Sequence, residues 1–563
     1  MKHDKQSESF KNLPRKKKIG FFSSMLIVMG SSIGAGIFFK SDEVLRNSRG
    51  NLILSIVCWI LAAFAVISMA IALAEVASVK KDNMSLVGWN QIFNSRWVYN
   101  ASKNFMIYLT LPLTFFYMPV YTIQVLQDGI GAITDKPALT FGTSHDWLIW
   151  LLITTLMGLY LLLVPGLVSK IGNIHNTIVL AIKFIPLVFI IVVGFILAFN
   201  GKGGVDTVKI TTFNTNYSIK LGDSFIQYSA SAGFIGVFLS IGAIFFAYDG
   251  FYIAAGMQSE MKKPEKTTLA LSLGLIIITI LYIAIAVAMS INGGSFSNMR
   301  NYIQNLFGLK PGKIIFGAIN IAIAIGVFGV INAFSMWMPR FIETLIKKGE
   351  MPLWNKFIHK LNPHRPTIGV IYSIIIGVGA NIIFTLIGSL LYIPTNSNYL
   401  KYSNDSLLSM ARLYSFTDLI ANWITVFSFV FIALAIIGAI KNRKTGKIAI
   451  KNPKKNFLFF GYITVIFVSL AMLAQILVPI IDLITTFKFD VQYYATVQKV
   501  SIEVAKHEFT SLIVGRAMLV VVLVIFHVLV FVVSPIEDII HKKQYGSVEK
   551  YNQYRSKMLS KYE

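Results

Sequence analysis

Long apolar stretches recur along this chain and leave no polar stretch large enough for a soluble domain. A helix that crosses a bilayer needs about 20 apolar residues, and about twelve segments meet that requirement. They lie near residues 19–44, 52–79, 98–127, 146–164, 172–199, 232–258, 267–291, 313–346, 367–391, 411–440, 456–481 and 511–534. Only 14% of the 563 residues are charged, against about 25% in soluble domains. We therefore expect an all-α integral membrane protein with about twelve transmembrane helices.

The first and sixth segments are each interrupted by small or polar residues, at 30–36 and at 246–250. A helix broken at membrane depth exposes backbone groups that lipid cannot satisfy, so such breaks occur where the backbone lines a cavity. The offset of five segments predicts an inverted repeat of five plus five helices. Residues 19–199 would form one half and residues 232–440 the other, with two appended helices in 456–534.

The basic residues that give the chain its formal charge of +25 are distributed unevenly between the two predicted sides of the membrane. If both termini are cytoplasmic, the inner segments hold 33 Lys and Arg residues, the outer loops hold 15, and three lie within spans. That asymmetry is typical of multi-pass proteins. It predicts a basic cytoplasmic N-terminus (1–18), a membrane domain (19–534) and a cytoplasmic tail (535–563). Binding to nucleic acid would need a folded basic domain, and the sequence has none.

The sequence lacks the residue patterns that several other classes of protein require. The single cysteine, Cys58, excludes an intrachain disulfide, and no Cys/His spacing typical of a metal site occurs. The acidic residues within the spans are few and scattered, which argues against an enzyme. No repeated filter residues indicate a channel. We expect neither a cofactor nor a metal.

Short motifs occur in the order that one transporter family shows. They are Gly30–Phe38, Ala74–Val76, Phe245–Phe251, Glu260–Pro264, Asn332 with Arg340, and Gly349–Pro352 with Pro366. From about residue 19 to 440 the chain resembles the amino acid–polyamine–organocation superfamily of permeases. The resemblance implies a secondary active transporter that moves amino acids by alternating access. With no organelle signal and an Ile-, Lys-, Asn- and Phe-rich composition, we expect a bacterial plasma membrane.

The first break has the donors that an amino acid carboxylate needs. Unwinding after Ser32 frees the N–H groups of Gly34, Ala35 and Gly36 at the positive end of the outer half-helix. The Ser32 carbonyl would accept from the substrate ammonium, and the resemblance implies the same roles. The alternative is that the glycines form a close helix–helix contact.

The second break adds acceptors and aromatic rings. The carbonyl groups of Phe246 and Asp249 would complete the ammonium site. The rings of Phe246 and Tyr248 would either cover the bound substrate or stack on a cationic side chain. Ordinary packing is the alternative for both rings.

Lys183 lies in the middle of the fifth segment, where a charge is costly. The resemblance implies a coupling role, because some proton-coupled family members carry a lysine here whose ammonium replaces a sodium ion. Residues 317–334 of the eighth segment contain no Ser or Thr that could bind sodium. We therefore expect protons as a partner. A lysine that is ion-paired or reaches the membrane surface is the alternative.

Asp249 stands where the family usually has an apolar residue. A buried carboxylate needs a partner, and a cationic substrate such as lysine, arginine or ornithine would supply one. Two other interpretations remain: Asp249 pairs with Lys183, or it caps the broken helix. Neutral amino acids and polyamines are the alternative substrates. Symport or exchange and the oligomeric state stay open.

Overall fold

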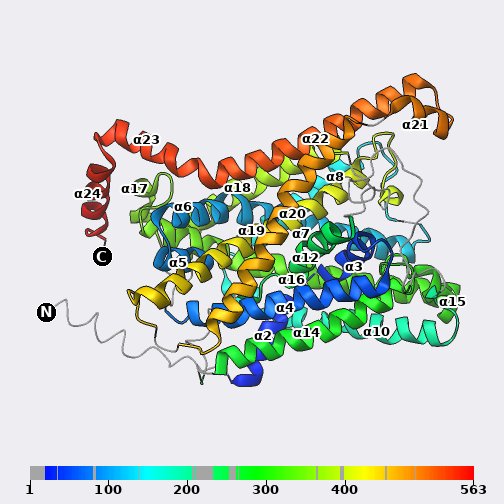
Figure 1. The fold of residues 1–563 in the computed structure, drawn as a ribbon, viewed down its shortest axis with the longest axis horizontal. Coiled ribbons are helices and arrows are strands. Elements are labelled where there is room, and N and C mark those ends of the chain that lie inside the picture. Colours follow the sequence, from blue (N-terminus) through cyan, green and yellow to red (C-terminus); the bar gives the residue numbers. More distant parts are fainter. Residues whose placement is uncertain are drawn as a thin grey trace.

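The computed structural model describes residues 20–34, 36–79, 84–136, 138–205, 210, 232–252, 262–263, 266–362, 365–393, 399–450, 453–488 and 490–562. Within these ranges the regular secondary structure is helical (Figure 1), as expected. The helices are α2 (Phe21–Ser32), α3 (Gly36–Asn47), α4 (Leu52–Val76), α5 (Ser85–Phe93), α6 (Arg96–Phe105), α7 (Leu111–Ile133), α8 (Asp146–Leu163), α9 (Ser169–Ile182), α10 (Phe184–Phe199), α12 (Ala232–Ala247), α14 (Thr267–Ser290), α15 (Arg300–Phe307), α16 (Leu309–Lys347), α17 (Trp354–Phe357), α18 (Thr367–Leu386), α19 (Ser409–Thr445), α20 (Phe457–Thr486), α21 (Val491–Gln498), α22 (Ile502–Phe531), α23 (Val533–Tyr545) and α24 (Val548–Leu559).

The twelve predicted segments all coincide with helices. In the described ranges ten helical segments are long and apolar enough to cross a membrane, and the bent pair α2 and α3 makes an eleventh. The shorter apolar helix α12 occupies the sixth predicted position, and residues 253–258 of that segment lie outside the described residues. The sequence is therefore that of a multi-pass membrane protein.

Helix packing shows the symmetry that a five-plus-five repeat requires. The second segment packs on the seventh (α4 on α14), and the third on the eighth (α7 on α16). Other contacts come in matching pairs. The first segment packs on the seventh (α2 on α14) as the sixth packs on the second (α12 on α4), and the fifth packs on the seventh (α10 on α14) as the tenth packs on the second (α19 on α4). A pseudo-two-fold axis that exchanges two halves produces this pairing.

The appended helices cover one side of this core. α20 packs against α19, α4 and α12, and α22 packs against α20 and α6. Figure 1 shows α22 and α23 running along one edge, with α24 turned at their end. Large apolar side chains such as Leu152, Ile375 and Val524 are exposed on the outside, where a bilayer would cover them.

The connections lie at two opposite ends of the bundle. Figure 1 places α5, α17 and α24 at one end, and α15 and α21 at the other. Helices that cross a membrane in turn produce this alternation. The end that carries α5, α17 and α24 is the one that the charge pattern predicts to be cytoplasmic.

Local sequence explains several helix boundaries. The side chain of Asn51 accepts the N–H of Leu54 at 2.8 Å and so caps α4. Ser501 caps α22 in the same way. A π-helical turn at Met106–Thr110 joins α6 to α7, and such turns often occur at functional sites.

Candidate functional site

The first break separates α2 from α3, whose axes are bent by 58°. α2 ends at Ser32, Ile33 and Gly34 follow in non-helical conformation, and α3 begins at Gly36. Ser32 is buried, and its hydroxyl has no hydrogen-bond partner among the described residues. Ala35 lies outside the described residues. Small residues therefore separate the two half-helices, as predicted.

The second break follows α12, which ends at Ala247. Tyr248, Asp249 and Gly250 form a turn, and Gly250 has a φ of +98°. Glycine adopts that conformation without the strain that a Cβ atom causes. The helix that begins at Phe251 is described only as far as Tyr252.

The two breaks interlock through glycines. A Cβ atom at Gly36 would lie 2.8 Å from the backbone nitrogen of Ala247, and one at Gly250 would lie 2.5 Å from the carbonyl oxygen of Ser31. Each break thus packs a glycine directly on the backbone of the other. Gly36 therefore both begins α3 and packs closely on a neighbouring helix, which was the alternative interpretation of the glycines in the first break.

Tyr282 of α14 bridges the two breaks. Its hydroxyl lies 2.9 Å from the carbonyl oxygen of Ala247 and 3.2 Å from that of Ser32. The Phe246 carbonyl accepts the N–H of Asp249 at 3.3 Å. Two of the carbonyl groups predicted to bind a substrate ammonium, those of Ser32 and Phe246, therefore have partners within the protein in this structure.

Lys183 lies at the junction of α9 and α10 and is 9% exposed. Its ammonium donates hydrogen bonds to the carbonyl of Gly30 and, at 3.3 Å, to that of Ile33. These carbonyls are at the C-terminal end of α2, which has no intrahelical donors and attracts cations. Gly326 of α16 faces the Lys183 side chain. The predicted coupling residue is thus held at the first break.

Asp249 lies in the turn with no cationic partner. Its carboxylate accepts the N–H of Gly250 at 2.9 Å and a hydrogen bond from the hydroxyl of Tyr252. Among the described residues, the ion pairs include neither Asp249 nor Lys183. The predicted alternative of an Asp249–Lys183 pair is not formed here.

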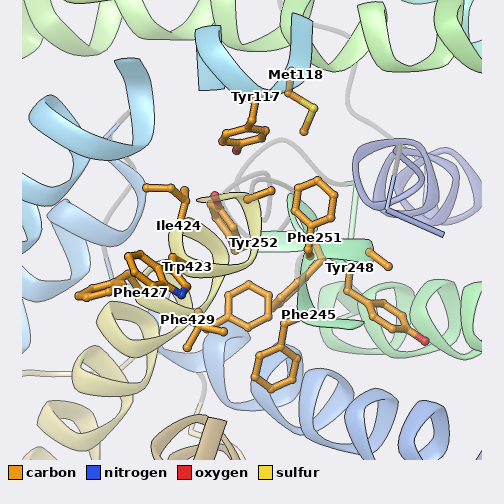
Figure 2. Packing of buried hydrophobic residues seen from close by; sticks show 14 of the residues in the cluster. Tyr117, Met118, Phe245, Tyr248, Phe251, Tyr252, Trp423, Ile424, Phe427 and Phe429 are labelled. Atoms are coloured by element: carbon orange, nitrogen blue, oxygen red, sulfur yellow. The ribbon is translucent and has the colours of Figure 1, made fainter. Parts of the chain in front are cut away.

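Aromatic rings surround the second break. Phe246 lies between Tyr117 and Tyr121 of α7, with ring centroids 6.0 and 5.7 Å away. The Tyr248 hydroxyl bonds Thr279 at 2.8 Å. In Figure 2, Tyr252 lies near the centre of the cluster with Tyr117 above it, whereas the ring of Tyr248 points away from both. The geometry therefore favours Phe246 as the ring nearer a substrate.

A buried ion cluster lies beside Phe246, and sequence reasoning missed it. Lys40 of α3 is fully buried and pairs with Asp418 of α19 at 2.9 Å and with Glu43 at 3.3 Å. The hydroxyl groups of Tyr121 and Tyr399 also donate to Asp418. The Lys40 ammonium is 5.2 Å from the centroid of the Phe246 ring. We call Lys40, Glu43 and Asp418 the outer clamp.

The outer clamp could have been suspected from isolated charges within apolar runs. Lys40 and Asp418 each interrupt a predicted segment, and intramembrane charges pair with one another. Lys40 was counted with an outer loop because it lies close to the end of its segment. Lys40 and Asp418 are 378 residues apart, and the sequence around each one does not indicate that the other is its partner.

Comparison with known proteins adds one family match and three relatives. Residues 19–498 match a family model described as "Amino acid permease". An uncharacterized protein of Mycoplasma pneumoniae is 46% identical over 96% of this chain and 97% of its own length. A second one from that organism is 28% identical over 50% of this chain and 96% of its own length. The serine/threonine exchanger SteT of Bacillus subtilis is 24% identical over 61% of this chain and 71% of its own length.

Proposed function

Because the chain belongs to the amino acid permease family, we propose that it is a secondary transporter that carries amino acids by alternating access. The observation that supports this most is the contact between the two breaks, where Gly36 packs on Ala247 and Gly250 packs on Ser31. Two half-helix ends that meet in this way expose free N–H and C=O groups to one small ligand. The N–H groups of Gly34, Ala35 and Gly36 would hold the substrate carboxylate.

The substrate ammonium would displace an internal hydrogen bond. The Ser32 carbonyl is shared with Tyr282, and a substrate that binds there would take the place of the tyrosine hydroxyl. Phe246 would cover the ligand on the side of the outer clamp. A conformational change at α3 could then follow substrate binding, since Lys40 contacts both Phe246 and Asp418.

Proton coupling would act through Lys183. Its ammonium holds the end of α2 through the carbonyls of Gly30 and Ile33. Loss of its proton would remove one charge and weaken both hydrogen bonds. The first break would then be free to change shape, which links protonation to alternating access.

A cationic substrate is proposed from Asp249. Its carboxylate lies at the second break with hydrogen bonds to Gly250 and Tyr252, and no cation of the described residues pairs with it. The side chain of lysine, arginine or ornithine would provide one. The second candidate is exchange of small neutral amino acids, which the name of the relative SteT favours.

The location is also a proposal. The membrane would be a bacterial plasma membrane, with the end that carries α5, α17 and α24 in the cytoplasm. Both the Lys and Arg bias and the bacterial relatives support it. Accessibility of single cysteines placed in α15 and α24 of a Cys58→Ala chain would test the orientation.

Uptake into proteoliposomes tests the proposed function. Purified protein is reconstituted, and uptake of each labelled amino acid is measured with and without the same unlabelled amino acid inside. A transporter gives saturable uptake that internal substrate accelerates. Flux that rises linearly with concentration, or no flux of any amino acid, would contradict the proposal. Protein-free liposomes are the control.

A further inference from the structure

A cavity with both polar and apolar walls lies outside the two breaks. It has a volume of about 210 Å³ and is formed by α3, α12, α19, α20 and α22. Its lining includes Glu43 and Asp418 of the outer clamp and the buried pair Asp482 and Arg516. Neither the second break nor Lys183 contributes to its lining. The cavity is therefore distinct from the proposed transport site.

Three of the residues that line this cavity carry buried oxygen atoms that have no hydrogen-bond partner among the described residues. Gln475 of α20 is 6% exposed and Asn422 of α19 is 7% exposed, and their amide oxygens have no hydrogen-bond partner among the described residues. The hydroxyl oxygen of Ser415 is unpartnered as well. Burial of such groups is costly unless a ligand or water satisfies them.

The orientation of the Asn422 amide is determined by Glu43. Its amide nitrogen donates to Glu43 Oε1 at 2.8 Å, so the amide oxygen must point the other way. A reversed amide would place two acceptor oxygens together. The free group at Asn422 is therefore an acceptor, and it requires a ligand that donates hydrogen bonds.

The charge of the lining indicates the same ligand. Three carboxylates, Glu43, Asp418 and Asp482, line the cavity with two cations, Arg46 and Arg516. The lining side chains therefore carry a net charge of −1, and Lys40, which pairs with Glu43 and Asp418 outside the lining, neutralises it until a ligand displaces Lys40 from Glu43. Apolar side chains such as Leu239 and Val478 complete the wall. Unpartnered acceptors, negative charge and apolar surface together suit a small organic cation that bears N–H groups.

We propose that this cavity is a second binding site, selective for a primary ammonium group on an amino acid or a polyamine. The ammonium donates to Asn422 and Gln475 and lies beside Glu43. Because Glu43 also pairs with Lys40, the ligand competes with Lys40 for that carboxylate and loosens the outer clamp. The site then adjusts how readily the outer side opens, in addition to the proposed transport function.

The test measures binding to the full chain in detergent, so it does not depend on transport. Labelled putrescine and L-lysine are titrated onto the Asp249→Asn variant, in which the proposed transport site is weakened. Saturable binding of either probe is expected, and which one binds identifies the source of the ammonium. Tetramethylammonium, which has a positive charge but no N–H group, should not compete.

Two substitutions at one position make the test directional. In the Asp249→Asn background, Gln475→Met removes the acceptor with little change in length and should weaken binding at least tenfold. Gln475→Glu adds a carboxylate and should tighten it. Each variant is first shown to elute as a single species on size exclusion.

Four results with the two probes, the variants and tetramethylammonium would each overturn the proposal, and a fifth comes from competition by simple salts. The four are no saturable binding of either probe, unchanged affinity in Gln475→Met, weaker binding in Gln475→Glu, and equal competition by tetramethylammonium. Competition by sodium or potassium chloride at millimolar concentration would instead indicate a metal cation site, and would also overturn it.

Discussion

The fully buried Lys40 of α3 and the partly buried Asp418 of α19 form an ion pair with 2.9 Å between Nζ and Oδ1. α3 is the outer half of the broken first segment, and α19 is the tenth segment. Their pairing ties a half-helix at the first break to the opposite repeat. It also places a cation over Phe246. The pair therefore connects α19 to the proposed substrate site.

Loss of one partner of this pair should be strongly destabilising. Lys40→Met leaves the Asp418 carboxylate buried without its cation, a change that typically costs about 3–5 kcal/mol. We expect a lower melting temperature for Lys40→Met and for Asp418→Asn. The double variant should be more stable than the sum of the two single effects predicts. Additive effects would contradict coupling.

A second ion pair provides the control. Lys313 and Asp135 are 2.5 Å apart, but Asp135 is 71% exposed. Hydrogen bonding to Lys313 lowers the pKa of Asp135, yet water screens such a pair. Lys313→Met should leave the melting temperature nearly unchanged.

Tyr282→Phe should weaken the junction of the two breaks. The change leaves the carbonyls of Ser32 and Ala247 without their shared donor, and a buried unsatisfied group costs about 1–3 kcal/mol. Thermal unfolding is the measurement, and transport affinity should also change. Tyr248→Phe is matched in size and loses a hydroxyl that bonds only Thr279. Equal effects of the two changes would contradict the bridging role of Tyr282.

Gly250→Ala should damage the interlocked breaks. The new methyl group would lie 2.5 Å from the Ser31 carbonyl oxygen, at a residue whose φ is +98°. We expect loss of transport and a lower melting temperature. Gly379→Ala in α18 is the control, because nothing lies within 4 Å of its added methyl group and alanine favours a helix. A transport-competent Gly250→Ala variant would argue against close packing here.

The segments and their breaks could be predicted because both depend on local sequence. Runs of about 20 apolar residues specify spans, and small residues in 30–36 specify an interruption. The partners of those residues could not be predicted. The hydroxyl of Tyr282 reaches Ser32 across 250 residues, and a tyrosine within an apolar helix has no sequence signature for that role. The sequence predicts the N–H of Gly36 as a donor to the substrate carboxylate, whereas the contact of Gly36 with Ala247 depends on how α12 packs on α3.

That contact changes which substitutions are informative at the first break. A large side chain at Gly36 would displace α12, because even a Cβ atom meets the Ala247 backbone. Loss of binding in such a variant would reflect disturbed packing. Lys183 gives a cleaner test of this region.

Lys183→Met should uncouple transport from protons. Stimulation of uptake by an inward proton gradient should disappear, while exchange without a gradient remains. Lys103→Met is the control, since Lys103 is a buried cation that pairs with Glu350 at 3.4 Å, away from the breaks. That variant should keep the response to the gradient. A strict requirement for sodium in the unaltered protein would refute proton coupling.

Asp249→Asn tests the substrate class. The carboxylate of Asp249 has hydrogen bonds to Gly250 and Tyr252 but no cationic partner in the described part of the chain. A cationic substrate side chain would form a charge-assisted hydrogen bond worth about 1.5–3 kcal/mol. Its loss should reduce uptake of lysine and arginine at least tenfold, since about 1.4 kcal/mol corresponds to that factor. Uptake of a neutral amino acid should be spared, and Asp249→Glu should retain part of the cationic uptake. Normal lysine uptake by Asp249→Asn, or a preference of the unaltered protein for serine or threonine over lysine, would favour the neutral exchanger instead.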